Sequence, residues 1–259
     1  MEKINIGLQQ HSIRAAFEKD PVAAMRAVKA MGYDGMELLY WTLDKSATFY
    51  KDAMDEIGLK CFGCMGNTGT LAPENIHETI AFVKELGAPT VVIGGVNPVR
   101  LEEDPDYPAE AVEYMNWVFG HMQDAGLITG YHSHPMDSKR VGDISFYEMT
   151  MEGTPKEFAM VVDTGNTQGG GDDPLALLKK YPGRTPLLHL KGYNDKDKFQ
   201  TPLWESDTDW DALLSQALDN CGTNTIIVEF GACGDQDPME RAAKSVEWLR
   251  NQLQKMGRL

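Results

Sequence analysis

Basic residues are scarce in this chain of 259 residues. It contains 24 Lys and Arg against 39 Asp and Glu, which gives a formal net charge of −15 at pH 7. Such a field repels nucleic acid unless a local patch concentrates positive charge, and the sequence contains no such patch. We therefore expect no nucleic acid partner.

Long hydrophobic runs and cysteine pairs are also missing. No stretch approaches the ~20 apolar residues of a membrane span, and the first ten residues, MEKINIGLQQ, contain no signal-peptide core. These absences predict a soluble cytoplasmic protein with no membrane partner. Cys61 and Cys64 form a C-x-x-C, but no second pair lies at zinc-ribbon spacing, so we expect reduced packing cysteines.

The glycine patterns of nucleotide-binding loops do not occur either. A Gly-x-Gly-x-x-Gly motif is absent after the first predicted strand, where the chain reads Gly7-Leu8-Gln9. The run 169–171 is not followed by Gly-Lys-Ser/Thr, so it is no Walker-type phosphate loop. These absences disfavour a doubly wound open sheet.

What the chain does contain is a regular alternation of strand and helix patterns. The predicted helices lie between short strands rich in Val, Ile and Leu, which suit a parallel sheet buried on both faces. The strands are expected at residues 4–9, 34–39, 59–64, 90–93, 127–132, 158–162, 186–190 and 225–229. Eight such units without a linker predict a single (β/α)8 TIM barrel, one domain over residues 1–259.

The segment 160–193 shows how this alternation builds a site. It reads as strand, helix, strand, and a polar residue ends each strand: Asp163 after the first and His189 in the second. Asp173 can cap the intervening helix, and Pro174 suits its first position. Because a crossover helix sets parallel strands side by side, Asp163 and His189 should meet at one rim.

Other polar residues follow or end predicted strands, at the edge where barrel active sites lie. They are His11, Glu37, His132, His134 and Glu229. A carboxylate in an apolar strand is costly without a partner. Asp163, His189 and Glu229 come from three successive strands at one height, which favours a divalent-metal site over a hydrogen-bonded polar cluster.

On these residues the chain resembles the sugar phosphate isomerase/epimerase group of the xylose isomerase-like barrel superfamily. The matching segments spread over nearly the whole chain in the family's order. They are IGLQQHSIR, MGYDGMELLY, GYHSHP, MVVDTGNTQGGGDDPLALLKKYPGRTPLLHLKGY, DTDWDALLSQA and IIVEFGACGDQDPMERAAKSVEWL.

The resemblance implies a barrel that binds Mn²⁺, Mg²⁺ or Zn²⁺ through one ligand from each of the last four strands. By position these are His132 or His134, then Asp163, His189 and Glu229. Many relatives have Glu at the strand-five position, and those that epimerise use it as one of two bases. Position 166 is Asn where nuclease-type relatives have a further His ligand, which argues against a DNA-repair nuclease.

The expected chemistry is proton abstraction next to a metal-polarised carbonyl of a keto-sugar or polyol. Glu229, or Glu37 from across the barrel mouth, would take the proton, and Lys191 and His132 would act as acids or oxyanion partners. The candidate substrate-binding residues are His11, Arg14, His134 and Trp204. Plainer roles stay open: Glu37 could pair with Arg14, and Trp204 could serve loop packing.

Two further functions stay open for the same barrel. The usual strand-five glutamate is missing, and its absence favours a keto-sugar lyase or dehydratase. Such an enzyme would resemble inosose dehydratase or would cleave 3-keto-glycosides. The chain could also be a non-catalytic sugar-binding subunit. Its expected partners are a small carbohydrate and possibly a second copy of itself in a homo-oligomer.

Overall fold

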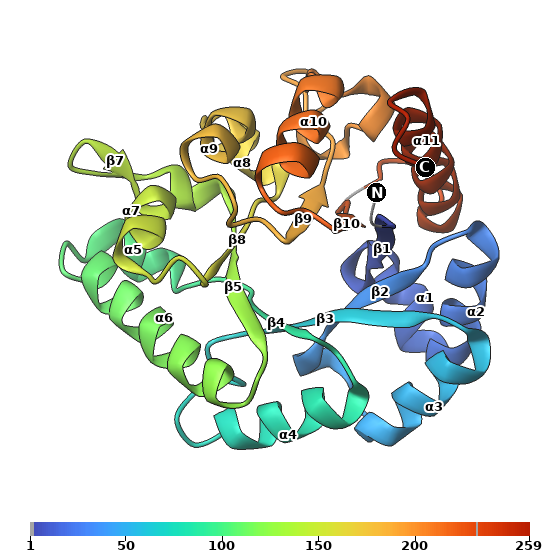
Figure 1. The fold of residues 1–259 in the computed structure, drawn as a ribbon, viewed down its shortest axis with the longest axis horizontal. Coiled ribbons are helices and arrows are strands. Elements are labelled where there is room, and N and C mark those ends of the chain that lie inside the picture. The colour runs from blue at the N-terminus through green and yellow to red at the C-terminus, as the bar shows by residue number, and fades with distance from the viewer. Residues whose placement is uncertain (1–2, 232) are drawn as a thin grey trace.

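Eight parallel strands form the centre of the structure, a computed structural model that describes residues 3–231 and 233–259. They neighbour one another in the order β8-β5-β4-β3-β2-β1-β10-β9, and helices surround them (Figure 1). The strands are β1 (Asn5–Gln9), β2 (Gly35–Leu39), β3 (Lys60–Gly66), β4 (Thr90–Ile93), β5 (Ile128–His132), β8 (Ala159–Val161), β9 (Leu187–Leu190) and β10 (Thr225–Val228). The predicted (β/α)8 barrel is confirmed.

The helices connect these strands, and a short hairpin, β6 (Arg140–Val141) with β7 (Ile144–Ser145), projects from the connection after β5. The helices are α1 (Arg14–Lys19), α2 (Pro21–Met31), α3 (Ala47–Ile57), α4 (Ile76–Leu86), α5 (Pro98–Glu103), α6 (Tyr107–Asp124), α7 (Phe146–Gly153), α8 (Thr164–Gly170), α9 (Pro174–Lys180), α10 (Trp210–Asn220) and α11 (Pro238–Lys255).

The barrel closes at the segment from which the sequence predicts a site. An isolated parallel bridge joins Asp163, just after β8, to His189 in β9. The backbone N–H of His189 donates to the carbonyl of Val162 at 2.9 Å. Closure therefore places the side chains of Asp163 and His189 at the same rim, as the strand–helix–strand pattern predicts.

The barrel interior is filled by side chains below that rim. Leu39, Phe62, Met65, Val92, Ala159, Val161, Leu187 and Ile227 form a buried apolar cluster. Phe62 fits because Gly35 lacks a side chain: a Cβ there would lie 2.5 Å from the Phe62 ring and 2.4 Å from a backbone oxygen. The polar residues at the strand ends thus lie next to an apolar layer of the barrel interior.

Local capping signals explain where the predicted helices begin and end. The Asp20 side chain accepts a hydrogen bond from the Ala23 N–H at 2.9 Å, and Pro21 takes the first position of α2. Gly32 ends α2 with φ of 102°, a left-handed conformation that glycine adopts without strain. Asp173 caps α9 in the same way as Asp20, through the N–H of Leu175.

Several connections between the strands contain short helical segments. Residues 97–107 contain α5, which Asn97 caps through the N–H groups of Val99 and Arg100. Residues 10–20 contain a 3-10 turn, η1 (Gln10–Ile13), and α1. The helix α7 begins at Phe146, directly after the hairpin in which Ile144 and Ser145 pair.

The described ranges contain no helix with the length and hydropathy needed to cross a bilayer. All four cysteines are free thiols, as predicted, and the interaction with Cys61 together with burial raises the pKa of Cys64.

Candidate metal centre

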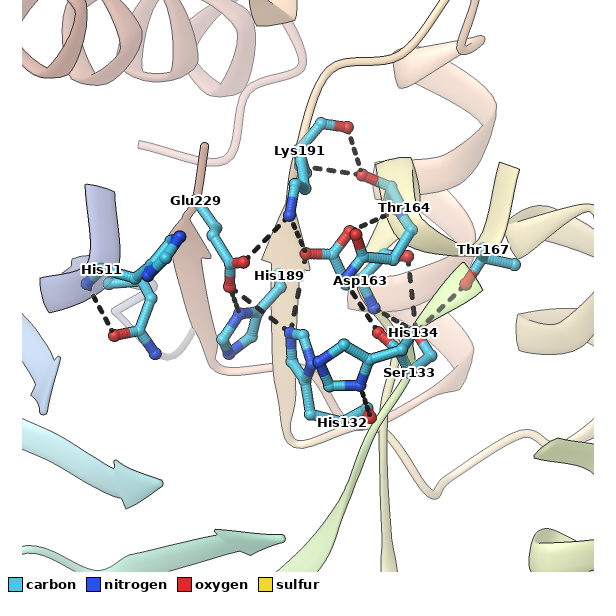
Figure 2. A network of polar contacts seen from close by, with 12 residues as sticks. His11, His132, Ser133, His134, Asp163, Thr164, Thr167, His189, Lys191 and Glu229 are labelled. Carbon is cyan, nitrogen blue, oxygen red and sulfur yellow. Dashed lines mark hydrogen bonds and ion pairs between the residues drawn. The ribbon is translucent and has the colours of Figure 1, made fainter. Parts of the chain in front are cut away.

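Four side chains from the last four barrel strands converge at the carboxyl end of the barrel (Figure 2). His132 ends β5, Asp163 follows β8, His189 lies in β9 and Glu229 follows β10. One nitrogen or oxygen of each lies within 4.8 Å of the corresponding atom of the others, and all four residues are buried. Topology thus brings together residues separated by up to 97 positions in the sequence.

The distances define a small polar centre around Glu229 Oε2. This oxygen lies 2.9 Å from His189 Nδ1 and 3.4 Å from His132 Nε2. His132 Nε2 also lies 3.6 Å from Asp163 Oδ2. Two imidazole nitrogens and two carboxylate oxygens therefore face one point.

The start of α8 orients Asp163. Its Oδ1 accepts from the backbone N–H of Asn166 at 2.7 Å and so caps the helix. The backbone N–H of Asp163 donates to Ser133 Oγ at 2.8 Å. These two bonds fix the carboxylate and leave Oδ2 directed at the centre without a hydrogen-bond partner.

The centre fits a divalent cation on two grounds. Buried polar atoms are normally hydrogen-bonded, yet Asp163 Oδ2 and both ring nitrogens of His132 have no partner. The groups agree: three buried carboxyl groups, those of Glu37, Asp163 and Glu229, accompany one buried ammonium, that of Lys191. Mixed nitrogen and oxygen ligands suit Zn²⁺ and Mn²⁺.

Lys191 stands beside the candidate ligands. Its Nζ lies 3.1 Å from Glu229 Oε1 and 3.8 Å from Asp163 Oδ2, and Phe199 covers it with a ring centroid 5.8 Å away. Burial lowers the pKa of Lys191, but Glu229 and Asp163 outweigh burial and raise it. Burial likewise raises the pKa of Glu229, yet Lys191 and the two histidines hold it well below its usual range. The ammonium and the carboxylate therefore both stay charged.

His189 faces a carboxylate on each side of its ring. Nδ1 meets Glu229, and Nε2 lies 3.3 Å from Glu37 Oε2. Burial lowers the pKa of His189, but Glu37 and Glu229 raise it to about 10. Either a second proton or a cation must therefore stand between Nδ1 and Glu229. With a cation there, the Nε2–H faces Glu37, the arrangement that orients metal-binding histidines.

The sequence suggested that Glu37 lies across the barrel mouth, but the structure places it next to His189. It is fully buried under His189, and Gln9 Nε2 donates to its Oε2. Gln9 and Glu37 are partners in the register of β1 and β2. The alternative pairing of Glu37 with Arg14 is not formed, because Arg14 pairs with Glu18 at 3.4 Å. Gln9 was not identified from the sequence.

We expect Glu37→Gln to weaken binding of Zn²⁺ by about 10–100-fold. The amide keeps the shape of the side chain but can present an N–H to His189 Nε2, which favours the wrong tautomer. Competition against a chromophoric chelator gives the Zn²⁺ affinity, with Glu113→Gln on the exposed face of α6 as the control of equal charge change. Equal affinities in the two variants would show that Glu37 does not orient His189.

Of the two strand-five histidines that the sequence leaves open, His132 is in the group of four. His134 lies next to it, with ring centroids 4.9 Å apart and with its Nδ1 3.2 Å from the His132 carbonyl oxygen. Burial and His132 lower the pKa of His134 to about 4, so its imidazole is neutral. The geometry favours His132 as the ligand.

The other candidate substrate residues lie on the connections that follow β1 and β9. His11 and Arg14 are exposed in η1 and α1, after β1. Trp204 is half-buried in a 3-10 turn, η5 (Leu203–Glu205), on the connection that follows β9. Figure 2 shows His11 beside Glu229, on the side away from Asp163.

Asp137, close to the centre, is a buried carboxyl group. Tyr131 donates to it at 2.8 Å and the His134 N–H donates at 2.7 Å. Burial is the main cause that raises its pKa to about 7. An unfolded Asp has a pKa of about 3.9, so the folded state holds the extra proton between about pH 4 and 7, and stability from this group is lost as pH rises through that window.

Asp137→Asn should remove this pH dependence, because an amide keeps the shape of the carboxyl group, can still accept from the His134 N–H and carries no titrating proton. Between pH 5 and pH 8 the free energy of unfolding of the wild type should fall relative to the variant, by about 1.4 kcal/mol per shifted pKa unit at most. Urea unfolding at several pH values measures it. Parallel curves for the two proteins would contradict the assignment.

Comparison with known proteins decides the family. The model of the family described as xylose isomerase-like TIM barrel matches residues 25–252. This chain belongs to the xylose isomerase-like TIM barrel family. Its match covers most of the chain, as the resemblance of the sequence segments predicts.

Solved structures similar to this family member share the fold. A sugar phosphate isomerase/epimerase from Parabacteroides distasonis superposes with a TM-score of 0.80 at 21% identity, over 96% of this chain and 94% of that one. The 3-keto-D-glucoside 4-epimerase from E. coli gives a TM-score of 0.70 at 18% identity, over 96% of this chain and all of the other.

A curated sequence relative is the inosose dehydratase of Bacillus cereus (strain AH820). It is 28% identical over 46% of this chain. The match spans only 44% of that relative's own length.

Proposed function

We propose that this chain is a metal-dependent sugar isomerase or epimerase that removes a proton next to the carbonyl of a keto-sugar or polyol-derived substrate. The observation that carries the proposal is the convergence of His132, Asp163, His189 and Glu229 at the barrel mouth, with Lys191 beside them. The family and the printed names of the similar proteins support it.

A divalent ion bound by the four side chains would polarise a substrate carbonyl and its neighbouring hydroxyl. Glu229 is ionised and is therefore able to accept the proton from the carbon between them. Lys191 keeps its proton because its pKa is raised, so it stabilises negative charge on the substrate oxygen rather than acting as an acid. His132 and His134 complete the wall that faces the substrate.

Isomerisation and epimerisation need the proton to return to a different carbon or to the opposite face. A two-base mechanism would use a second carboxylate across the substrate. Glu37 is fully buried with Gln9 donating to its Oε2, and a histidine, His132, occupies the strand-five position, which favours a site with Glu229 as its base. Return of the proton would then rely on Glu229 alone or on water.

This arrangement favours a second candidate, a keto-sugar lyase or dehydratase with the same first step. The C–H bond breaks, its electrons form a carbon–carbon double bond, and the β C–O bond breaks as the leaving oxygen takes a proton. One base near a cation suffices for this reaction. The partial match to an inosose dehydratase supports it.

One experiment separates these candidates from a non-catalytic sugar-binding subunit. The Mn²⁺-loaded protein is incubated in D2O with ketoses, keto-inositols and 3-keto-glycosides, and products are identified by NMR. Deuterium on the carbon next to the carbonyl indicates proton abstraction, and an isomeric sugar or an unsaturated ketone then distinguishes epimerase from lyase. Sugar binding without any exchange or product would contradict both enzymatic proposals.

A further inference from the structure

A cleft of about 440 Å³ lies on the His11 side of the candidate metal centre. It is bounded by η1 and α1 on one side and by the start of α11 on the other. Its volume is within the range of about 300–1,000 Å³ typical of small-molecule sites. Apolar groups make up much of its wall, from Ile13, Ala15, Ala16, Pro238 and Met239.

Three polar side chains of this cleft have a partner within the chain. Ser12 Oγ accepts from the Phe230 N–H at 2.9 Å. Arg14 pairs with Glu18. Asp237 Oδ1 accepts from the first two free N–H groups of α11, at 2.7 and 3.1 Å. Among the described residues that line the cleft, His11 presents an imidazole that is able to serve a ligand hydroxyl.

This chemistry disfavours both a sugar ring and a phosphate in the cleft. A sugar would bring hydroxyls on nearly every carbon, and unpaired buried polar groups are costly. A phosphate would need free cationic or N–H donors. Here a phosphate would meet the Glu18 carboxylate beside Arg14 and the Asp237 carboxylate at the N-terminus of α11. An apolar group carries no hydroxyl or phosphate oxygen that would need a hydrogen-bond partner in the cleft.

His11 lies between the cleft and the centre (Figure 2). This residue lines the cleft and lies beside Glu229 in Figure 2. Burial lowers the pKa of His11, and the charges of Glu229 and Lys191 act on it as well, which reflects their proximity. The Phe230–Ser12 hydrogen bond ties the cleft to the residue after Glu229. A group attached to a sugar at Glu229 can therefore extend past His11.

We propose that this cleft binds an apolar substituent, such as an aromatic aglycone, attached to the sugar, so that the substrate is a keto-glycoside rather than a free sugar or a sugar phosphate. The proposal rests on the proposed function, in that the sugar itself reacts at Glu229. It adds a specificity site formed by α1 and the start of α11.

The test compares methyl and 4-nitrophenyl 3-keto-β-glucosides on the Mn²⁺-loaded protein. The wild type should prefer the aryl substrate by at least about tenfold in kcat/KM, mainly through KM, because the ring buries apolar surface. Ala15→Phe fills the cleft and should abolish the preference while the methyl glycoside reacts as before. Ala23→Phe, the same change on the exposed face of α2, should behave as wild type. Equal use of both substrates by the wild type, or an equal loss for both in Ala15→Phe, would overturn the proposal.

A binding measurement keeps this result separate from the proposed function. If neither keto-glucoside reacts, the proposed function fails on these substrates, and calorimetry with unoxidised 4-nitrophenyl and methyl β-glucosides tests the cleft by itself. The cleft proposal then requires tighter binding of the aryl glucoside, lost in Ala15→Phe and kept in Ala23→Phe. Equal or absent binding of the two glucosides rejects it.

Discussion

Glu229→Gln is expected to lose the divalent metal and turnover together, with kcat/KM reduced on the order of 10³-fold or more. Glu229 Oε2 is the atom on which His132 and His189 converge, and Oε1 contacts Lys191 at 3.1 Å. The amide is nearly the same size but carries no charge, so it is a poor ligand and cannot accept the proton. Metal content after dialysis and initial rates at saturating Mn²⁺ measure the two effects.

The control for Glu229→Gln is again Glu113→Gln, which changes charge equally on an exposed helix. Thermal unfolding of both metal-free variants checks that the fold is kept. Normal metal content with a large loss of rate would restrict Glu229 to proton transfer. Normal metal content and normal rates would refute the site.

Replacement of the two strand-five histidines should have opposite results for the metal. His132→Ala is expected to weaken metal binding by about 100-fold or more, because His132 Nε2 faces both Asp163 and Glu229. His134→Ala should leave the metal affinity within about threefold and raise KM, because its ring lies outside the group of four. Calorimetric titration of each metal-free protein with Mn²⁺ makes the comparison.

The His134 variant is the matched control for the His132 variant, since it removes an imidazole two residues away. A reversed outcome, in which His134→Ala loses the metal and His132→Ala retains it, would show that the strand-five ligand is His134. Equal losses would indicate that the whole connection after β5 has moved.

The fold follows from the sequence because the spacing of apolar residues agrees along the chain with the residues that begin and end helices. Apolar runs, caps such as Asp20 and stops such as Gly32 recur at each unit, and their number predicts a closed barrel. Asp163 and His189 could be paired in advance because a crossover connection brings neighbouring parallel strands together. That prediction depends on topology alone and not on side-chain packing.

Other features depend on register and packing, which the sequence does not display. Gln9 reads as an ordinary strand residue, and its bond to Glu37 exists because β1 and β2 align these two positions. Glu37 follows the same pattern as Glu229 in the sequence, yet it is directed under His189 rather than toward the mouth. The helix α8 was missed because TGNTQGG has poor helix propensity, while the Asp163 cap supports it.

Some expectations stay predictions. They are a single domain over residues 1–259, a cytoplasmic location, the absence of a nucleic acid partner and a homo-oligomer. The same holds for the substrate-binding roles of His11, Arg14, His134 and Trp204.

Anomalous diffraction from crystals of the Mn²⁺-loaded protein tests the central claim most directly. The account predicts one strong manganese peak at the carboxyl end of the barrel, bound by His132 Nε2, Asp163 Oδ2, His189 Nδ1 and Glu229 Oε2. A crystal with saturating Mn²⁺ and no peak among these four atoms, or a peak held by other side chains, would contradict it.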